Sequence, residues 1–293
     1  MTAALACAGL GHRYSRGIWG LSDCSLQVPP GRVVALVGPN GSGKTTLMNM
    51  AAGLLPASTG TVQVAGDTPA RRLDRIGFVA QDAPLWPRLR VADVLAVGRC
   101  LNPGFDAAMA AERIRRLDIR PGARISTLSG GQRAQVALTL VLAKKPELFL
   151  LDEPMANLDP LARREFLSAM LGACTETGAA VLFSSHAVAE LERICDYLIV
   201  LSAGRVRLAG DIDELRLRHR VVSGPAAWPH QGGWQVISSR TTAGRTTALV
   251  RSDAAPPAAP HAGPGLEETA PTFDELVLGY LDETAPAHEE ALA

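Results

Sequence analysis

The chain has 293 residues with 29 basic and 29 acidic side chains, so its formal net charge is zero, and 47% of its residues are hydrophobic. That length allows one large α/β domain with a smaller unit beside it, and the charge balance argues against a nucleic-acid-binding surface. No apolar run approaches the roughly 20 residues that cross a bilayer, and the first residues lack the basic and apolar regions of a signal peptide. We therefore expect a cytoplasmic protein with no nucleic-acid partner.

The cysteine pattern favours a reducing compartment. Five cysteines are scattered at positions 7, 24, 100, 174 and 195, without the C-x-x-C spacing of many metal and redox sites. An odd number of dispersed cysteines predicts free, buried thiols rather than disulfide bridges or a metal site.

The first 32 residues contain short apolar segments, such as residues 21–28, that are interrupted by glycine and proline. This pattern predicts antiparallel strands that lead into the next motif. Tyr14 lies among them, and an aromatic ring shortly before a nucleotide loop can stack on a purine face. Taken alone, a half-buried strand tyrosine is the better interpretation of this residue.

Residues 33–37 form an apolar run that leads into the spacing G-x-x-x-x-G-K-[ST], made by Gly38, Pro39, Asn40, Gly41, Ser42, Gly43, Lys44 and Thr45. The glycines let the backbone wrap around phosphate oxygens, and the N–H groups of the loop and of the next helix present partial positive charge to them. Lys44 is expected to reach the β- and γ-phosphates, and the Thr45 hydroxyl is expected to ligate Mg²⁺. An ordinary glycine-rich turn is the alternative. The strand before the loop and the helix-compatible sequence from Thr45 to Met50 favour a nucleoside triphosphate site.

The helix after this loop is predicted to end at Gly53, and short strands at 61–65 and 76–79 follow. Gln81 comes directly after the second strand. A glutamine there can reach a metal-bound water or the γ-phosphate, although as an isolated residue it would be unremarkable. Residues 84–125 are mainly helical in pattern and predict a helical subdomain inserted into the α/β alternation.

The pentapeptide Leu128-Ser129-Gly130-Gly131-Gln132 opens the next predicted helix. Ser129 and Gln132 have the S-x-x-Q spacing of a capping box. Capping does not explain two adjacent glycines in the first turn, because glycine is a poor helix former. Bare N–H groups and a serine hydroxyl at a helix start also make a second anion site. The capping and the anion-binding interpretations are compatible with each other.

Two adjacent carboxylates follow the apolar run at 148–151, which predicts a parallel strand buried on both faces. Asp152 and Glu153 then lie at the carboxyl end of a central strand, where open α/β sheets bind ligands. One of them can hold Mg²⁺ through water and the other can polarise an attacking water. A solvated acidic turn is the alternative. Beyond them, Asp159 is a predicted N-cap, with Pro160 at the first helical position.

A further apolar strand at 180–183 ends in Ser184-Ser185-His186, and a helix is predicted over 189–194. A lone histidine is usually structural. At the end of a central strand, in a sheet that already carries a phosphate loop, His186 is a candidate contact for the γ-phosphate. Residues 197–201 and 205–209 predict a closing hairpin.

The pattern changes near residue 218, which predicts a main domain at 1–218 and a C-terminal extension at 219–293. Segments 234–239 and 246–251 predict a hairpin. The Ala- and Pro-rich stretch 253–265 predicts a linker, and 272–281 predicts a short amphipathic helix. No chemistry is visible in this extension.

With these motifs in this order, residues 5–215 resemble the ATP-binding subunit of ATP-binding cassette (ABC) transporters. The combination of the phosphate loop with the pentapeptide at 128–132 is highly specific, and Gln81, 148–153, 157–159 and His186 fall in the family's order. The resemblance implies an α/β phosphate-loop cassette with a mixed central sheet, an N-terminal antiparallel β part, an inserted helical subdomain and a small C-terminal extension.

The resemblance also implies roles for single residues around ATP and Mg²⁺. The catalytic candidates are Lys44, Gln81, Glu153 and His186, with Glu153 polarising the attacking water. The metal candidates are Thr45, Gln81 and Asp152. The remaining nucleotide contacts are Tyr14, which would stack on adenine, the loop from Gly38 to Thr46, Asp159, and, from a second subunit in a head-to-tail dimer, Ser129, Gly130, Gly131 and Gln132.

The sequence around His186 and the run 158–164 look like single-domain subunits of bacterial export systems of the ABC-2 type. Importer subunits more often place threonine before this histidine and aspartate after it. The resemblance therefore implies an exporter ATPase on the inner face of the cell membrane, bound to a separately encoded permease and paired with an identical or paralogous ATP-binding subunit. An importer subunit and a soluble cassette ATPase are the alternatives. The intact Lys44, Asp152, Glu153 and His186 argue against a catalytically silent module.

Overall fold

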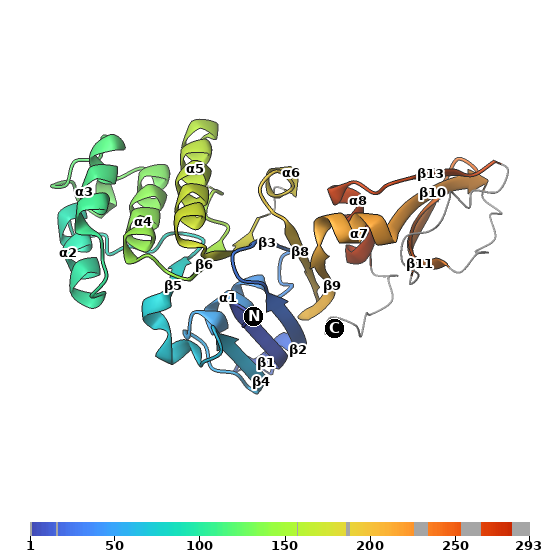
Figure 1. The fold of residues 1–293 in the computed structure, drawn as a ribbon, viewed down its shortest axis with the longest axis horizontal. Helices are drawn as coiled ribbons and strands as arrows, with labels where there is room; N and C mark the ends of the chain where they lie inside the picture. The colour runs from blue at the N-terminus through green and yellow to red at the C-terminus, as the bar shows by residue number, and fades with distance from the viewer. Residues whose placement is uncertain are drawn as a thin grey trace.

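The computed structural model describes residues 2–15, 17–156, 158–185, 188–225, 234–252 and 265–282, and the structural statements below concern these residues. The centre of the molecule is a six-stranded sheet with the order β5-β6-β7-β3-β8-β9 (Figure 1). Neighbouring strands are parallel except at the edge, where β9 runs antiparallel to β8, so the expected mixed sheet and closing hairpin are both confirmed. The strands span β3 Val33–Val37, β5 Ile76–Val79, β6 Leu148–Asp152, β7 Ala180–Ser184, β8 Tyr197–Ser202 and β9 Arg205–Asp211.

Both faces of the central strands are buried, which explains their continuous apolar sequences. Successive side chains of a strand point to opposite sides of the sheet. On β6, Phe149 and Leu151 therefore pack into one core, while Leu148 and Leu150 pack into the other. The apolar run before the two carboxylates is a strand of this doubly covered kind, as its sequence predicts.

One face of the sheet is covered by α1 and by a separate antiparallel sheet with the order β2-β1-β4. The other face is covered mainly by α4 and α5. The helix α6 is shorter than the predicted 189–194, because the chain turns after Leu191 to enter β8. These elements span β1 Leu5–Arg13, β2 Trp19–Val28, β4 Thr59–Val64, α1 Lys44–Ala51, α4 Gly130–Lys144, α5 Pro160–Thr177 and α6 Val188–Leu191.

The predicted helical subdomain is present and has its own core. Helices α2 (Val91–Leu101) and α3 (Ala107–Arg116) lie beside α4, at the left of Figure 1. Val91, Val94 and Ile114 pack with Val136 of α4, so α4 links this core to the central sheet. Short 3-10 turns occur at η1 Pro69–Arg71, η2 Leu73–Arg75 and η3 Ile125–Thr127. Among the described residues, no helix is long and apolar enough to cross a membrane.

A C-terminal module follows α7 (Ile212–Arg218) and consists of a four-stranded sheet, in the order β11-β12-β10-β13, with α8. The predicted hairpin and terminal helix are confirmed, whereas β10 and β13 were not predicted. Most of the predicted linker at 253–265 lies outside the described residues. The elements span β10 His219–Pro225, β11 Trp234–Thr242, β12 Arg245–Ser252, β13 Glu267–Thr269 and α8 Phe273–Leu281.

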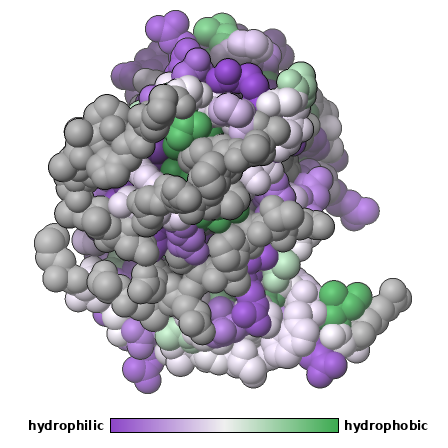
Figure 2. Space-filling view, turned by 90° about the vertical axis from the view of Figure 1, so that its right-hand side faces the viewer, coloured by the Kyte–Doolittle hydropathy of each residue, from purple (hydrophilic) through white to green (hydrophobic). Residues whose placement is uncertain are grey.

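The apolar face of α8 belongs to the same core as the central sheet. Phe273, Leu276 and Tyr280 are almost completely buried in one cluster that also contains Phe183 and Leu198. Figure 2 faces the end of the molecule that carries this module, where the visible described surface is largely hydrophilic with small, separate hydrophobic patches. The module is therefore packed onto the cassette rather than tethered beside it, and its division from residues 1–218 stays a prediction.

All five cysteines are free thiols, as predicted, but they are not all buried. Cys7, Cys24 and Cys195 are buried and Cys174 is partly buried, whereas Cys100 is exposed. Cys100 lies away from the stripe of Val91 and Val94 through which α2 contacts its core. The expectation of five buried thiols was wrong at this position.

This difference predicts a selective thiol reaction. Burial raises the pKa of Cys24 to about 12 and that of Cys174 to about 11, so few of their thiolates form at neutral pH. With Ellman's reagent at pH 7.5, the native protein should release about one equivalent quickly, and all five only after denaturation. The Cys100→Ser variant should lack the fast phase, and a persisting fast phase would show that another thiol is accessible.

Candidate active site

The phosphate loop connects β3 to α1, and close backbone contacts require glycine at two of its positions. A Cβ atom at Gly38 would lie 2.1 Å from the carbonyl oxygen of Leu201, and Gly43 has φ +106° with its Cβ position 2.5 Å from the oxygen of Gly20. The backbone N–H of Gly204 donates to the carbonyl of Ser42 at 3.0 Å. The hairpin of β8 and β9 therefore packs against the loop, and a side chain at Gly38 would clash with it. A side chain at Gly43 would clash with the backbone of β2.

Lys44 is buried inside the curve of its own loop. Its Nζ donates to the carbonyl oxygens of Gly38 at 2.7 Å and Pro39 at 3.1 Å. Burial lowers the pKa of Lys44, while the negative charges of Glu153 and Asp152 act in the opposite direction. A phosphate group bound in the loop would provide a full negative charge for this ammonium in place of neutral carbonyl groups.

Two further features of the loop fit an anion. The Ser42 hydroxyl is buried and has no hydrogen-bond partner among the residues that the structure describes. A buried polar group without a partner is costly, and a phosphate oxygen would satisfy it. Thr45 lies exposed in the first turn of α1, a turn without acidic side chains. This helix start thus presents free N–H groups and a hydroxyl.

Tyr14 lies next to the start of α1, although it is 42% exposed. Its hydroxyl hydrogen-bonds with the Thr46 hydroxyl at 2.9 Å, and its ring meets His12 edge-on at a centroid distance of 4.6 Å. One part of the ring is therefore held by neighbours and another part is open to solvent. The geometry fits a stacking surface for a base, and this role stays a prediction.

The acidic pair lies at the same edge of the sheet. Asp152 ends β6 and is 1% exposed, and Glu153 leaves the strand in the left-handed region with φ +47°. Gln81, from the end of the adjacent strand β5, donates from Nε2 to Oε2 of Glu153 at 3.4 Å. The structure thus brings together Gln81 and Glu153, which are 72 residues apart in the chain.

The strand order explains why these parts converge. β7 lies between β3, which carries the phosphate loop, and β6, which carries the carboxylates. Ser184 at the end of β7 pairs with Leu36 on one side and with Asp152 on the other. Parallel strands end at the same edge of a sheet, so the loop and the carboxylates share one site. His186 follows two residues later but lies outside the described residues, as does Asn157.

The pentapeptide at the start of α4 forms the predicted capping box. The backbone N–H of Gln132 donates to Ser129 Oγ at 3.1 Å, and that of Ser129 donates to Gln132 Oε1 at 3.0 Å. Asp159 likewise caps α5 by accepting from the N–H groups of Leu161 and Ala162 at 3.0 and 2.9 Å. The structural roles are confirmed. The nucleotide contacts of Gly130, Gly131 and their neighbours stay predictions.

Ser184 is a further residue of this site that was not predicted from the sequence. Its hydroxyl donates to Oδ1 of Asp152 at 2.7 Å and accepts from the backbone N–H of Glu153 at 3.0 Å. The residue was visible as the polar end of an apolar strand, but only the pairing of β7 with β6 shows what it contacts.

The residues at this edge fit ATP and Mg²⁺ chemically. Mg²⁺ takes oxygen ligands and keeps several waters, and Thr45, Asp152 and Gln81 offer a hydroxyl, a carboxylate and an amide oxygen. The loop offers the buried Ser42 hydroxyl, the Lys44 ammonium and backbone N–H groups for phosphates.

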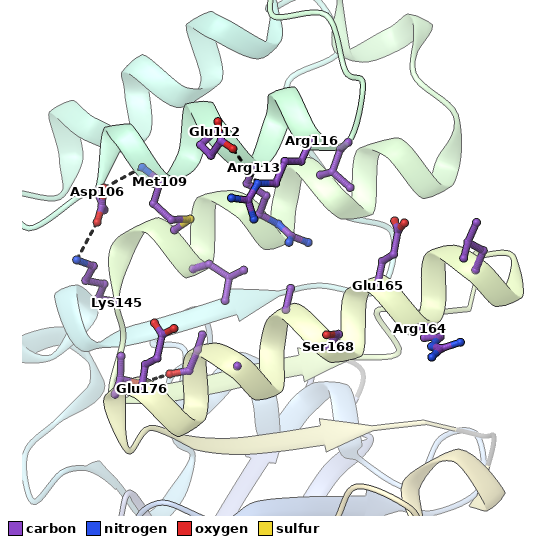
Figure 3. A pocket seen from close by; sticks show the side chains of 17 residues that line it. Asp106, Met109, Glu112, Arg113, Arg116, Lys145, Arg164, Glu165, Ser168 and Glu176 are labelled. Carbon is purple, nitrogen blue, oxygen red and sulfur yellow. Dashed lines mark hydrogen bonds and ion pairs between the residues drawn. The ribbon is translucent and has the colours of Figure 1, made fainter.

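A cleft of about 790 Å³ elsewhere on the molecule does not take part in this site. It lies between α3, the end of α4 and α5, and Figure 3 shows charged side chains of both signs around it. Lys145 pairs with Asp106 at 2.9 Å, and Arg116 pairs with Glu112 at 2.8 Å. Two basic side chains of this cleft are thus already paired with carboxylates of the same chain.

Comparison with known proteins identifies the family of this chain. The family described as "ABC transporter" matches residues 21–156, and a shorter match to the family "AAA domain, putative AbiEii toxin, Type IV TA system" covers 125–192. The Nod factor export ATP-binding protein I of Cupriavidus metallidurans is 35% identical over 230 residues, covering 73% of each chain. The chain belongs to the ABC transporter family. It is an ATP-binding cassette of that family, whose members are ATPases.

Other relatives are named as import proteins. The thiamine import ATP-binding protein ThiQ of Salmonella typhimurium is 37% identical, and the match covers 65% of this chain and 85% of ThiQ. The molybdenum import ATP-binding protein ModC of Mesorhizobium japonicum is 38% identical over 69% of this chain. The match spans 58% of the length of ModC. Because import proteins are prominent among these relatives, the comparisons favour the importer alternative over the expected export type.

Solved structures agree with the fold. An ATP-binding subunit of an ABC transporter superposes with a TM-score of 0.66 at 28% identity, covering 73% of this chain and 92% of that one. The cbiO1 protein of Clostridium perfringens, part of the ABC transporter complex cbiONQ, gives a TM-score of 0.62 at 27% identity, with coverage of 73% and 91%. The fold prediction is therefore confirmed.

Proposed function

We propose that this chain is the ATP-hydrolysing subunit of a membrane transporter and acts on the cytoplasmic side through a separately encoded membrane subunit. The observation that carries the proposal is the convergence of the phosphate loop, Gln81 and the carboxylates at one edge of the sheet. The names of the relatives, importers and an exporter alike, support the coupling to transport.

In this proposal each residue has a separate role in phosphoryl transfer, a reaction that depends on positioning and electrostatics. The loop N–H groups and Lys44 hold the β- and γ-phosphates, while Thr45, Asp152 and Gln81 hold Mg²⁺, which neutralises phosphate charge when it is bound. Glu153 accepts a proton from the attacking water. His186 contacts the γ-phosphate, and Tyr14 stacks on the base.

The pentapeptide at the start of α4 is proposed to act on a second subunit. Its capping box leaves Ser129 and Gln132 exposed at the molecular surface, so they are accessible to another chain. A head-to-tail dimer would place this helix start, together with Asp159, against the γ-phosphate held by the partner's loop. The partner is either an identical chain or a related cassette.

The membrane subunit is proposed to dock on an apolar groove against β5, the strand that leads to Gln81. The groove has a volume of about 310 Å³ and lies between β5, α2 and α4. Four large apolar side chains on its walls are more than half exposed: Leu54, Leu73, Trp86 and Leu101. A short apolar segment from a membrane protein would cover them, and its movement would reach Gln81 and Glu153 through the end of β5.

Import is the direction that the relatives favour, and export is the second candidate. The Nod factor export protein covers 73% of this chain, which keeps export open to test. The direction can be measured in proteoliposomes in which the ATPase faces outward. For an importer, a transported solute should stimulate ATP hydrolysis from the lumen. For an exporter, it should do so from the side of the ATPase.

The docking groove predicts a selective loss of membrane binding. Leu101→Arg should prevent capture, from detergent-solubilised host membranes, of a multispanning protein that stimulates the ATPase rate of the wild-type chain. The matched control is Leu217→Arg on α7, since Leu101 is 73% and Leu217 56% exposed and neither supports a core. Equal capture by the two variants would contradict this docking site, and capture of no such protein by the wild type would contradict the transporter assignment.

A further inference from the structure

We propose that Ser184 is a positioning residue that holds Asp152 and Glu153 in register for ATP hydrolysis. The inference rests on the proposed function of this site and adds a residue to it. Ser184 ends β7, between the strand of the phosphate loop and the strand of the carboxylates. It is completely buried, so its hydroxyl serves neighbours within the protein and not solvent.

One hydroxyl makes two hydrogen bonds to consecutive residues with different tasks. It donates to Oδ1 of Asp152 at 2.7 Å, which fixes the rotation of the carboxylate proposed to hold the metal. It accepts from the backbone N–H of Glu153 at 3.0 Å, and the same N–H lies 3.2 Å from the carbonyl oxygen of Ser184. By donating one hydrogen bond and accepting another, the Ser184 hydroxyl thus links Asp152, the proposed metal ligand, to Glu153, the proposed general base.

The backbone at Glu153 needs such a restraint. Its φ of +47° lies in the left-handed region, which residues with a Cβ rarely adopt. It also precedes Pro154, and a proline favours extended backbone at the residue before it. Conformations of this kind persist when surrounding contacts hold them. The Ser184 hydroxyl supplies one such contact at the point where the chain leaves β6.

Groups that orient metal ligands usually matter for function almost as much as the ligands do. Loss of such a group commonly costs about 10- to 100-fold in metal affinity or activity. We therefore expect Ser184→Ala to lower kcat about tenfold or more and to raise KM for the metal–ATP complex in step with the loss of metal affinity. Binding of metal-free nucleotide should not change, because the loop and Lys44 are untouched. Alanine removes the hydroxyl and leaves the carbonyl contact to Glu153 in place.

The test compares Ser184→Ala with Thr139→Val. Thr139 in α4 is also completely buried, and its hydroxyl donates to the carbonyl of Gln135 at 2.7 Å, so Thr139→Val removes a buried hydroxyl outside the site. Each variant is characterised by kcat, KM, melting temperature and Mn²⁺ affinity, the last by electron paramagnetic resonance with a non-hydrolysable ATP analogue. Ser184→Thr restores a hydroxyl and should recover part of the lost activity and Mn²⁺ affinity.

The proposal predicts weaker Mn²⁺ binding and lower kcat for Ser184→Ala only, with analogue binding in EDTA unchanged. Mn²⁺ affinity and kcat within twofold of the wild type would overturn it, as would equal losses in Thr139→Val. If the wild type binds the analogue but hydrolyses no ATP, the proposed function fails. The Mn²⁺ titration still decides the role of Ser184 in that case.

Discussion

Glu153→Gln is expected to lower kcat for ATP hydrolysis by about 100-fold or more, the usual contribution of a general base. Glutamine keeps the size of the side chain but removes the negative charge that accepts a proton from water. The phosphate loop, Lys44 and Ser42 are unchanged by this substitution, so ATP should still bind. Because hydrolysis would no longer open the proposed dimer, the variant should elute as a dimer on size exclusion in ATP, while the wild type elutes mainly as a monomer.

The matched control is Glu176→Gln, which removes one carboxylate from an exposed position on α5. It should hydrolyse ATP at the wild-type rate and show no trapped dimer. A Glu153→Gln variant that keeps a tenth or more of the wild-type kcat would contradict the role of Glu153 as the base. A wild type that neither hydrolyses nor dimerises alone would direct attention to the membrane subunit or to a different cassette as its partner.

Phe273→Ala in α8 is expected to lower the free energy of unfolding by about 3–5 kcal/mol, the range for truncating a buried phenylalanine. Phe273 is completely buried in the cluster that contains Phe183 and Leu198 of the central sheet. The substitution therefore leaves a cavity between the C-terminal module and the cassette. Urea unfolding followed by circular dichroism measures the change, and the loss should appear in the main transition.

Leu278→Ala is the control on the same helix, because Leu278 is 66% exposed. Its effect should stay within about 0.5 kcal/mol, as for most surface substitutions. If the module were an independent domain, Phe273→Ala would shift a separate transition and leave the unfolding of the cassette unchanged. That result would contradict a shared core.

The sequence by itself determined the parts that depend on local spacing. The phosphate loop has a fixed order of residue types, and the capping box at Ser129 and the N-cap at Asp159 depend on neighbours within one turn. The buried strand before Asp152 is readable from its continuous apolar run. These features need no knowledge of distant residues, so they were predicted correctly and carried the family assignment with them.

The tertiary structure decided what depends on pairing between distant segments. The role of Ser184 requires β7 to lie between β3 and β6 in one register, a pairing across 32 residues. The shared core of α8 requires the chain to return to the central sheet after the C-terminal strands, and the amphipathic pattern of α8 does not say which surface it covers. Local residue patterns select helices and strands, but strand order and helix docking follow from how all apolar faces are buried together, which only the folded chain shows.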